Sequence, residues 1–75
     1  MKFTDRWTKK QRYVEIEEAV SENGPIYIVA TNVAWPLMPL EFKNSVPVTS
    51  LLAVSTFRNA VGDWAVQNGF TRSEA

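Results

Sequence analysis

Cysteine and histidine are both absent from this sequence of 75 residues. Without cysteine the chain cannot form disulfides or thiolate metal sites, and without histidine it lacks the commonest general base and metal ligand. The three glycines stand apart, at positions 24, 62 and 69, so no glycine-rich phosphate loop is present. These absences predict a protein that is not an enzyme and that has no catalytic residues, no metal site and no cofactor.

Long apolar runs are also missing. No stretch approaches the roughly 20 residues that span a bilayer, and the opening residues, MKFTDRW, lack the apolar core of a signal peptide. We therefore expect a cytoplasmic protein without a membrane partner.

The length is sufficient for one domain, residues 1–75, and too short for two. A core of this size supplies only about 3–5 kcal/mol of net stability, and self-association is one way to add to it, so a homodimer is an open alternative. Aromatic residues make up 12% of the chain. They could fill the core or anchor a partner, and composition does not separate these uses.

The charges cancel overall but are sorted along the chain. Residues 1–12 carry five basic residues against Asp5, a local charge of +4, whereas residues 13–41 carry five glutamates and no basic residue, a local charge of −5. We favour a solvated surface whose two patches neutralise each other. The alternative is a basic segment that contacts nucleic acid, with residues 1–7 as an arm or a short strand.

Residues 8–22 carry the pattern of an amphipathic helix. Thr8 and Gln11 have the spacing of a capping box, and apolar side chains follow at positions 13, 16, 19 and 20, opposite glutamates at 15, 18 and 22. A solvated helix face explains these glutamates better than a site for a hard cation. The segment Asn23-Gly24-Pro25 is expected to end the helix.

Residues 26–31 form the best candidate for a strand, because they are β-branched and aromatic and follow a clear helix terminator. Prolines at positions 36, 39 and 47 interrupt the segment that comes next. Residues 37–43 are therefore expected as a short edge strand, where proline is tolerated, or as an ordered apolar loop.

Residues 49–68 predict a second amphipathic helix, with apolar residues at positions 51, 54, 57, 61, 64 and 65 on one face. Asn68 and Gly69 fit a C-terminal cap, with Phe70 packing back on the helix. Inside the helix Gly62 costs about 1 kcal/mol relative to alanine. Either another backbone approaches closely there or, as we slightly favour, the glycine is simply tolerated. Ser55 could instead cap a shorter helix, which leaves one helix or two as alternatives.

These patterns predict an α+β fold, in which two amphipathic helices pack on a small antiparallel hairpin or sheet in the order helix, strands, helix. Residues 71–75 are expected to form a frayed tail.

A helix that begins at Ser55 would present side chains able to bind DNA from its first turn. Arginine can bind guanine and asparagine can bind adenine through paired hydrogen bonds, and serine and threonine can contact phosphates. The candidates for nucleic-acid binding are Ser55, Thr56, Arg58 and Asn59, with Lys9, Lys10 and Arg12 as an arm or a clamp on the DNA backbone.

The C-terminal segment also carries Val54-Ser55, Phe57, Val61, Trp64 and Gly69-Phe70 at characteristic positions. On these residues the segment 51–70 resembles the recognition helix of winged helix-turn-helix DNA-binding domains, and residues 16–25 resemble their first helix and the turn after it. The resemblance implies a helix-turn-helix-like fold, contact with duplex DNA through residues 55–59 and a role in transcription regulation.

A second candidate site lies in the middle of the chain. Its residues are Tyr27, Trp35, Leu37, Met38, Leu40 and Phe42, in a segment stiffened by Pro36 and Pro39. Proline lowers the ordering cost of a contact loop, and tryptophan and methionine are common at interfaces. The segment is therefore either core or a protein-binding patch, and we favour core. The best prediction of function is DNA binding; the alternative is a protein-binding inhibitor or adaptor of the kind that phages and plasmids encode.

Overall fold

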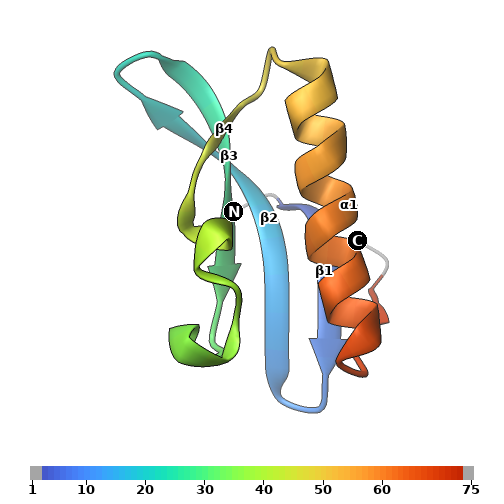
Figure 1. Cartoon of the computed structure of the whole chain (residues 1–75). Coiled ribbons are helices and arrows are strands. Elements are labelled where there is room, and N and C mark those ends of the chain that lie inside the picture. Colours follow the sequence, from blue (N-terminus) through green and yellow to red (C-terminus); the bar gives the residue numbers. More distant parts are fainter. Residues whose placement is uncertain (1–2, 74–75) are drawn as a thin grey trace.

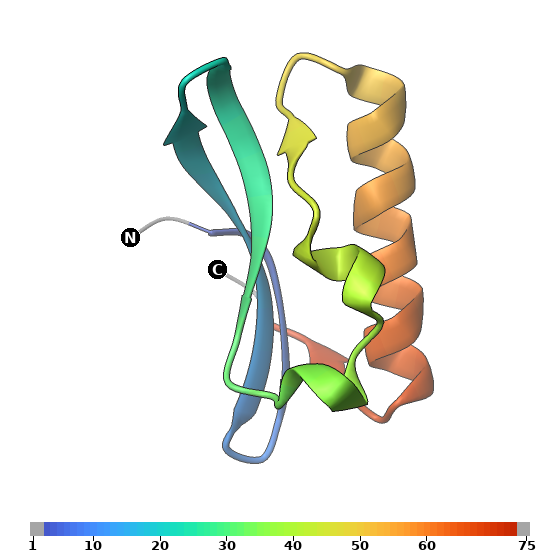
Figure 2. The ribbon, with the colours of Figure 1, turned by 60° about the vertical axis from the view of Figure 1, so that its left-hand side comes forward.

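In a computed structural model, which describes residues 3–73, five antiparallel strands form one curled sheet with a single α-helix across one face (Figures 1 and 2). The strand order is β4-β3-β2-β1-β5. The strands are β1 (Phe3–Lys9), β2 (Arg12–Ser21), β3 (Gly24–Thr31), β4 (Val46–Pro47) and β5 (Thr71–Arg72). Two short 3-10 helices, η1 (Trp35–Leu37) and η2 (Leu40–Lys43), lead from β3 to β4, and α1 (Leu51–Gln67) precedes β5.

The helix expected over residues 8–22 is wrong, because this segment lies in β1, a turn and β2. Its side chains alternate between two faces: Val14 and Ile16 are fully buried, whereas Glu15 and Glu17 point to the opposite side. The expected capping box is instead the β1–β2 turn, in which Lys10 has a φ of 56°. Pairing with strands on both sides stabilises β2 in place of a helix.

The segment expected to end that helix lies at the β2–β3 turn, with Gly24 and Pro25 as the first residues of β3. Gly24 has a φ of 111°, a conformation that favours glycine. The Ser21 hydroxyl donates to the Gly24 carbonyl at 2.9 Å and accepts from the Asn23 amide at 3.2 Å. The strand predicted over residues 26–31 lies within β3.

The proline-interrupted segment is not an edge strand. Residues 37–43 include the end of η1 and all of η2, so the ordered apolar loop is the alternative that the structure contains. Met38 and Phe42 point inward from it and belong to the core. The fold class of two helices on a hairpin is therefore wrong: the apolar partner of α1 is the sheet together with this loop.

Helix α1 runs without a break from Leu51 to Gln67, so residues 49–68 contain one helix rather than two. Phe57, Val61 and Ala65 form its buried face. Gly69 ends it with a φ of 85°, and the Phe70 amide donates to the Ala65 carbonyl at 2.9 Å.

Trp7 of β1 explains the glycine inside α1. A Cβ atom added at Gly62 would lie 3.1 Å from Cζ2 of the Trp7 indole, which is buried. A side chain, rather than another backbone, therefore approaches closely at Gly62, and a larger residue there would need the Trp7 ring to shift by a few tenths of an ångström. Through this contact the middle of α1 packs directly against β1.

Both ends of the described chain belong to the sheet. Residues 3–7 of the segment expected as an arm or short strand lie in β1, and residues 71 and 72 of the expected tail pair with β1 as β5. The rest of the expected arm, residues 1–2, and the end of the expected tail, residues 74–75, lie outside the described residues. None of the helices within residues 3–73 has the length and apolar character that crossing a membrane requires.

Candidate binding surfaces along helix α1

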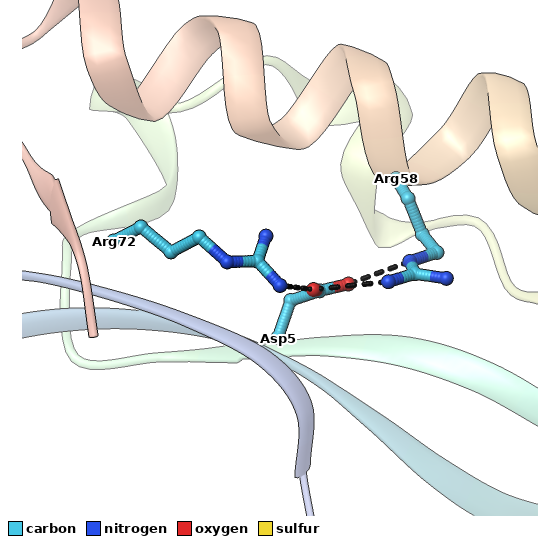
Figure 3. A network of polar contacts seen from close by, with 3 residues as sticks. All are labelled: Asp5, Arg58 and Arg72. Atoms are coloured by element: carbon cyan, nitrogen blue, oxygen red, sulfur yellow. Dashed lines mark hydrogen bonds and ion pairs between the residues drawn. The ribbon is translucent and has the colours of Figure 1, made fainter. Parts of the chain in front are cut away.

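The N-terminal half of α1 is joined to the sheet by a buried carboxylate. Asp5 of β1 is only 2% exposed. It accepts hydrogen bonds from Nε and Nη2 of Arg58 at 2.6 and 3.1 Å, and from Nη2 of Arg72 at 2.5 Å. Figure 3 shows the two guanidinium groups approaching the carboxylate from opposite sides. One carboxylate thus links β1, α1 and β5.

Two opposing effects set the pKa of Asp5. Burial raises it, but the hydrogen bonds and positive charges of Arg58 and Arg72 outweigh burial, and the net result is a lowered pKa. The hydrogen bond to Asp5 likewise raises the pKa of Arg58. Asp5 is therefore ionised at neutral pH, and the cluster carries two positive charges against one negative charge.

A groove of about 290 Å³ opens beside this cluster, between α1 and the β1–β5 edge of the sheet. It combines charged, polar and apolar walls. Its lining residues are Asp5, Trp7, Leu51, Val54, Ser55, Arg58, Asn59 and Arg72. We call it the arginine groove. Three of the four helix residues predicted to bind nucleic acid line it, namely Ser55, Arg58 and Asn59.

A second groove, of about 530 Å³, lies on the other flank of α1, against η2 and β4. Its walls are mainly apolar. The lining residues are Glu41, Phe42, Val46, Ser50, Leu52, Ala53, Thr56, Phe57 and Ala60. We call it the apolar groove. Leu52 stands at its edge with 82% of its surface exposed, and Thr56, the fourth predicted helix residue, lines it as well.

The predicted basic residues lie elsewhere. Lys9, Lys10 and Arg12 gather at the β1–β2 turn, where they line a third groove together with Gln11. This turn lies beside the C-terminal end of α1, because the Lys9 ammonium donates to the Asn68 carbonyl at 3.0 Å. The structure thus separates the predicted nucleic-acid residues into a group along the N-terminal half of α1 and a group near its end.

The proline segment divides between core and surface. Met38 and Phe42 are buried, and Trp64 of α1 meets the Phe42 ring edge-on at 6.4 Å between centroids. Tyr27 and Trp35 are half-buried against the core. Leu37 and Leu40 are exposed, so within the described residues these two are the members of the predicted protein-binding set that are free to meet a partner.

The uncovered face of the sheet carries an acidic pair. Glu15 is buried and forms an ion pair with Arg6 at 2.8 Å. A hydrogen bond with Glu15 raises the pKa of Glu17, and burial and the negative charge of Glu15 raise it further. Within residues 3–73 no group of three potential ligand side chains comes together to hold a metal ion.

Sequence reasoning missed Asp5 and Arg72 as members of a site, and it assigned Leu51 to the buried face of α1. The only signal for Asp5 was its position as the single acid in a basic segment. Leu51 and Leu52 are 81% and 82% exposed, although apolar helix positions usually face a core.

Comparison with known proteins gives no relative. No protein-family model, no curated protein and no solved structure matches this chain.

Proposed function

We propose that this protein is a non-enzymatic binding protein, acting in the cytoplasm, whose apolar groove takes up an apolar segment of a partner protein. The observation that supports the proposal is the groove itself, with Leu52 exposed at its edge. Covering one such leucine side chain in a complex contributes about 1.5–3 kcal/mol.

The solvent-facing side of α1 adds a second argument. A solvated helix usually presents charged residues to water, but the exposed residues of this helix include only two charged ones, Asp63 and Arg58. The other exposed residues are Leu51, Leu52, Ser55, Thr56, Asn59, Ala60, Val66 and Gln67. Of the two charged residues, Arg58 turns toward Asp5. Depletion of charge is typical of the centre of protein–protein interfaces.

The groove also has a suitable size and shape for a segment of polypeptide. Its volume of about 530 Å³ falls in the range of pockets that hold a drug-sized ligand, which is room for a few side chains of a polypeptide. Side chains from α1, η2 and β4 form its walls, so an amphipathic helix or an extended segment could place two or three apolar side chains along it. We therefore propose that a partner protein with such a segment occupies the apolar groove.

The test compares two exposed leucines that differ in position. A photo-crosslinking amino acid at position 52, in the apolar groove, is compared with one at position 40, where Leu40 is 66% exposed but outside the groove. We expect a protein crosslinked through position 52 and not through position 40. The purified partner should then bind Leu52→Glu at least tenfold more weakly than the wild type, and Leu40→Glu within twofold.

Two outcomes would overturn this proposal. Equal crosslinking at both positions, or unchanged affinity of Leu52→Glu, would show that the groove is not the interface. Crosslinking of position 52 to a second copy of this chain would replace the partner by a homodimer. Thermal unfolding of each variant checks that the fold is intact.

Duplex DNA is a second candidate, favoured by one observation: Lys9, Lys10 and Arg12 gather at a projecting turn between two strands. A two-stranded ribbon fits the major groove, and such cations neutralise phosphates. Readout by the first turn of a helix at Ser55 has lost its basis, because α1 does not begin there and Arg58 is bound to Asp5. DNA binding through the turn should fall steeply with salt and be lost in Lys10→Glu; absence of binding at low salt would refute it.

A further inference from the structure

The arginine groove holds more positive charge than its own residues balance. Arg58 donates through Nε and Nη2, and Arg72 through Nη2, all to Asp5. The Nη1 groups of both arginines donate to nothing within residues 3–73. The two guanidinium groups therefore present unused hydrogen-bond donors and one net positive charge to the groove.

The positions of these donors are fixed before any ligand arrives. Asp5 is buried and holds Arg58 through two hydrogen bonds, and the Arg72 guanidinium also lies over the Trp7 ring, 5.7 Å from its centroid. The arginine side chains remain 42% and 55% exposed, so a ligand can reach them. Guanidinium groups held in this way lose little further entropy when they bind an oxyanion.

The other residues that line the groove indicate which further chemical groups the ligand carries. Ser55 and Asn59 offer neutral hydrogen-bonding groups, and Leu51 and Val54 offer an apolar surface on the same side of the groove. A ligand that contacts both the arginines and the apolar residues carries a planar or tetrahedral oxyanion and a short aliphatic portion. Its volume is limited by the groove, about 290 Å³.

We propose that the arginine groove binds a small organic oxyanion, a carboxylate or a phosphate ester, through Arg58 and Arg72. This site lies on the opposite flank of α1 from the apolar groove and does not depend on the protein partner. Asp5 acts as the positioning residue that holds the two arginines, and the ligand supplies the negative charge that the cluster lacks.

Nuclear magnetic resonance of the arginine Nε–Hε groups tests the proposal. The full chain is titrated separately with 4-methylpentanoate, inorganic phosphate and chloride at constant ionic strength. We expect saturable shifts of the Arg58 and Arg72 signals with at least one oxyanion and none with chloride. A stronger response to 4-methylpentanoate identifies a carboxylate ligand, and a stronger response to phosphate identifies a phosphate ester.

Variants separate specific binding from general charge effects. Arg72→Gln should weaken binding about tenfold, as expected for one charge-assisted hydrogen bond. Leu51→Glu, which adds a negative charge at an exposed position of the groove, should weaken it severalfold even if Arg72→Gln fails to fold. Lys43→Gln removes a charge that does not line the arginine groove and should leave binding unchanged. The proposal is overturned by shifts that do not saturate, by equal shifts with chloride, or by equal binding of wild type and Leu51→Glu.

Discussion

Replacing both Arg58 and Arg72 by methionine should destabilise the fold far more than replacing Asp5 by asparagine. The double variant removes both partners of the Asp5 carboxylate, which is only 2% exposed in the wild type. Loss of the partners of a buried charge costs about 3–5 kcal/mol. Asp5→Asn leaves arginines that are 42% and 55% exposed and can be solvated, so its cost should be only about 1–2 kcal/mol.

The same reasoning predicts that a third substitution recovers part of the stability lost in the double variant. Adding Asp5→Asn to the Arg58→Met and Arg72→Met pair removes the unpaired buried charge, so the triple variant should be more stable than the double variant. Urea unfolding followed by tryptophan fluorescence measures all four free energies. A triple variant that is less stable than the double variant would refute the assignment of Asp5 as an ionised, buried acceptor.

The pH dependence supplies an independent check. In the wild type the pKa of Asp5 is lowered by folding, so its contribution is complete above its unfolded pKa and is lost as the pH falls through the folded value. In the double variant burial alone acts and raises the pKa. The stability gap between wild type and double variant should therefore narrow as the pH falls from 7 toward 4. A gap that is constant over this range would contradict the account.

Three further predictions concern the core, the helix contact and the acidic pair. Phe42→Ala should lower the unfolding free energy by about 3–5 kcal/mol because the ring is buried, whereas Leu40→Ala should change it by less than about 0.5 kcal/mol. Equal effects would show that Phe42 contributes no more to the core than Leu40. Gly62→Ala should destabilise by about 1 kcal/mol, because the clash with Trp7 exceeds the gain in helix propensity; a stabilised variant would show that the indole can move. Glu17→Gln should stabilise the protein at pH 7, because folding raises the pKa of Glu17. This gain in stability should vanish once the pH falls below the unfolded pKa of Glu17. A gain that persists at pH 3 would contradict the pairing with Glu15.

The C-terminal half of the fold could be predicted from the sequence because its signals are local. The apolar spacing around Phe57, Val61 and Ala65 has a helical period, and Gly69 and Phe70 form the expected cap. Residues 26–31 were likewise identified as a strand from their β-branched composition. In these segments tertiary contacts agree with the local preference.

The N-terminal half could not be predicted in the same way because two periods fit it. Tyr13, Ile16 and Val20 have helical spacing, but Val14 and Ile16 alternate with Glu15 and Glu17 at the period of a strand. Pairing of β2 with both neighbours decides between them, and that pairing joins residues distant in the sequence. With one helix fewer than expected, the helix-turn-helix unit is not present within residues 3–73.

The sites were only partly visible for the same reason. Ser55, Arg58 and Asn59 were recognised as a group because they are neighbours on one helix. Asp5, which binds Arg58, lies 53 positions away in the sequence. The apolar groove was also missed, because its walls come from α1, η2 and β4, which are brought together only by the fold.

Whether the apolar groove binds a partner is decided by the affinity of Leu52→Glu for the protein crosslinked at position 52, with Leu40→Glu as the matched control. If it does, the dissociation constant rises at least tenfold for Leu52→Glu, because about 1.5 kcal/mol or more from buried leucine surface is lost. Dissociation constants that agree within twofold for the wild type and both variants would contradict binding in this groove.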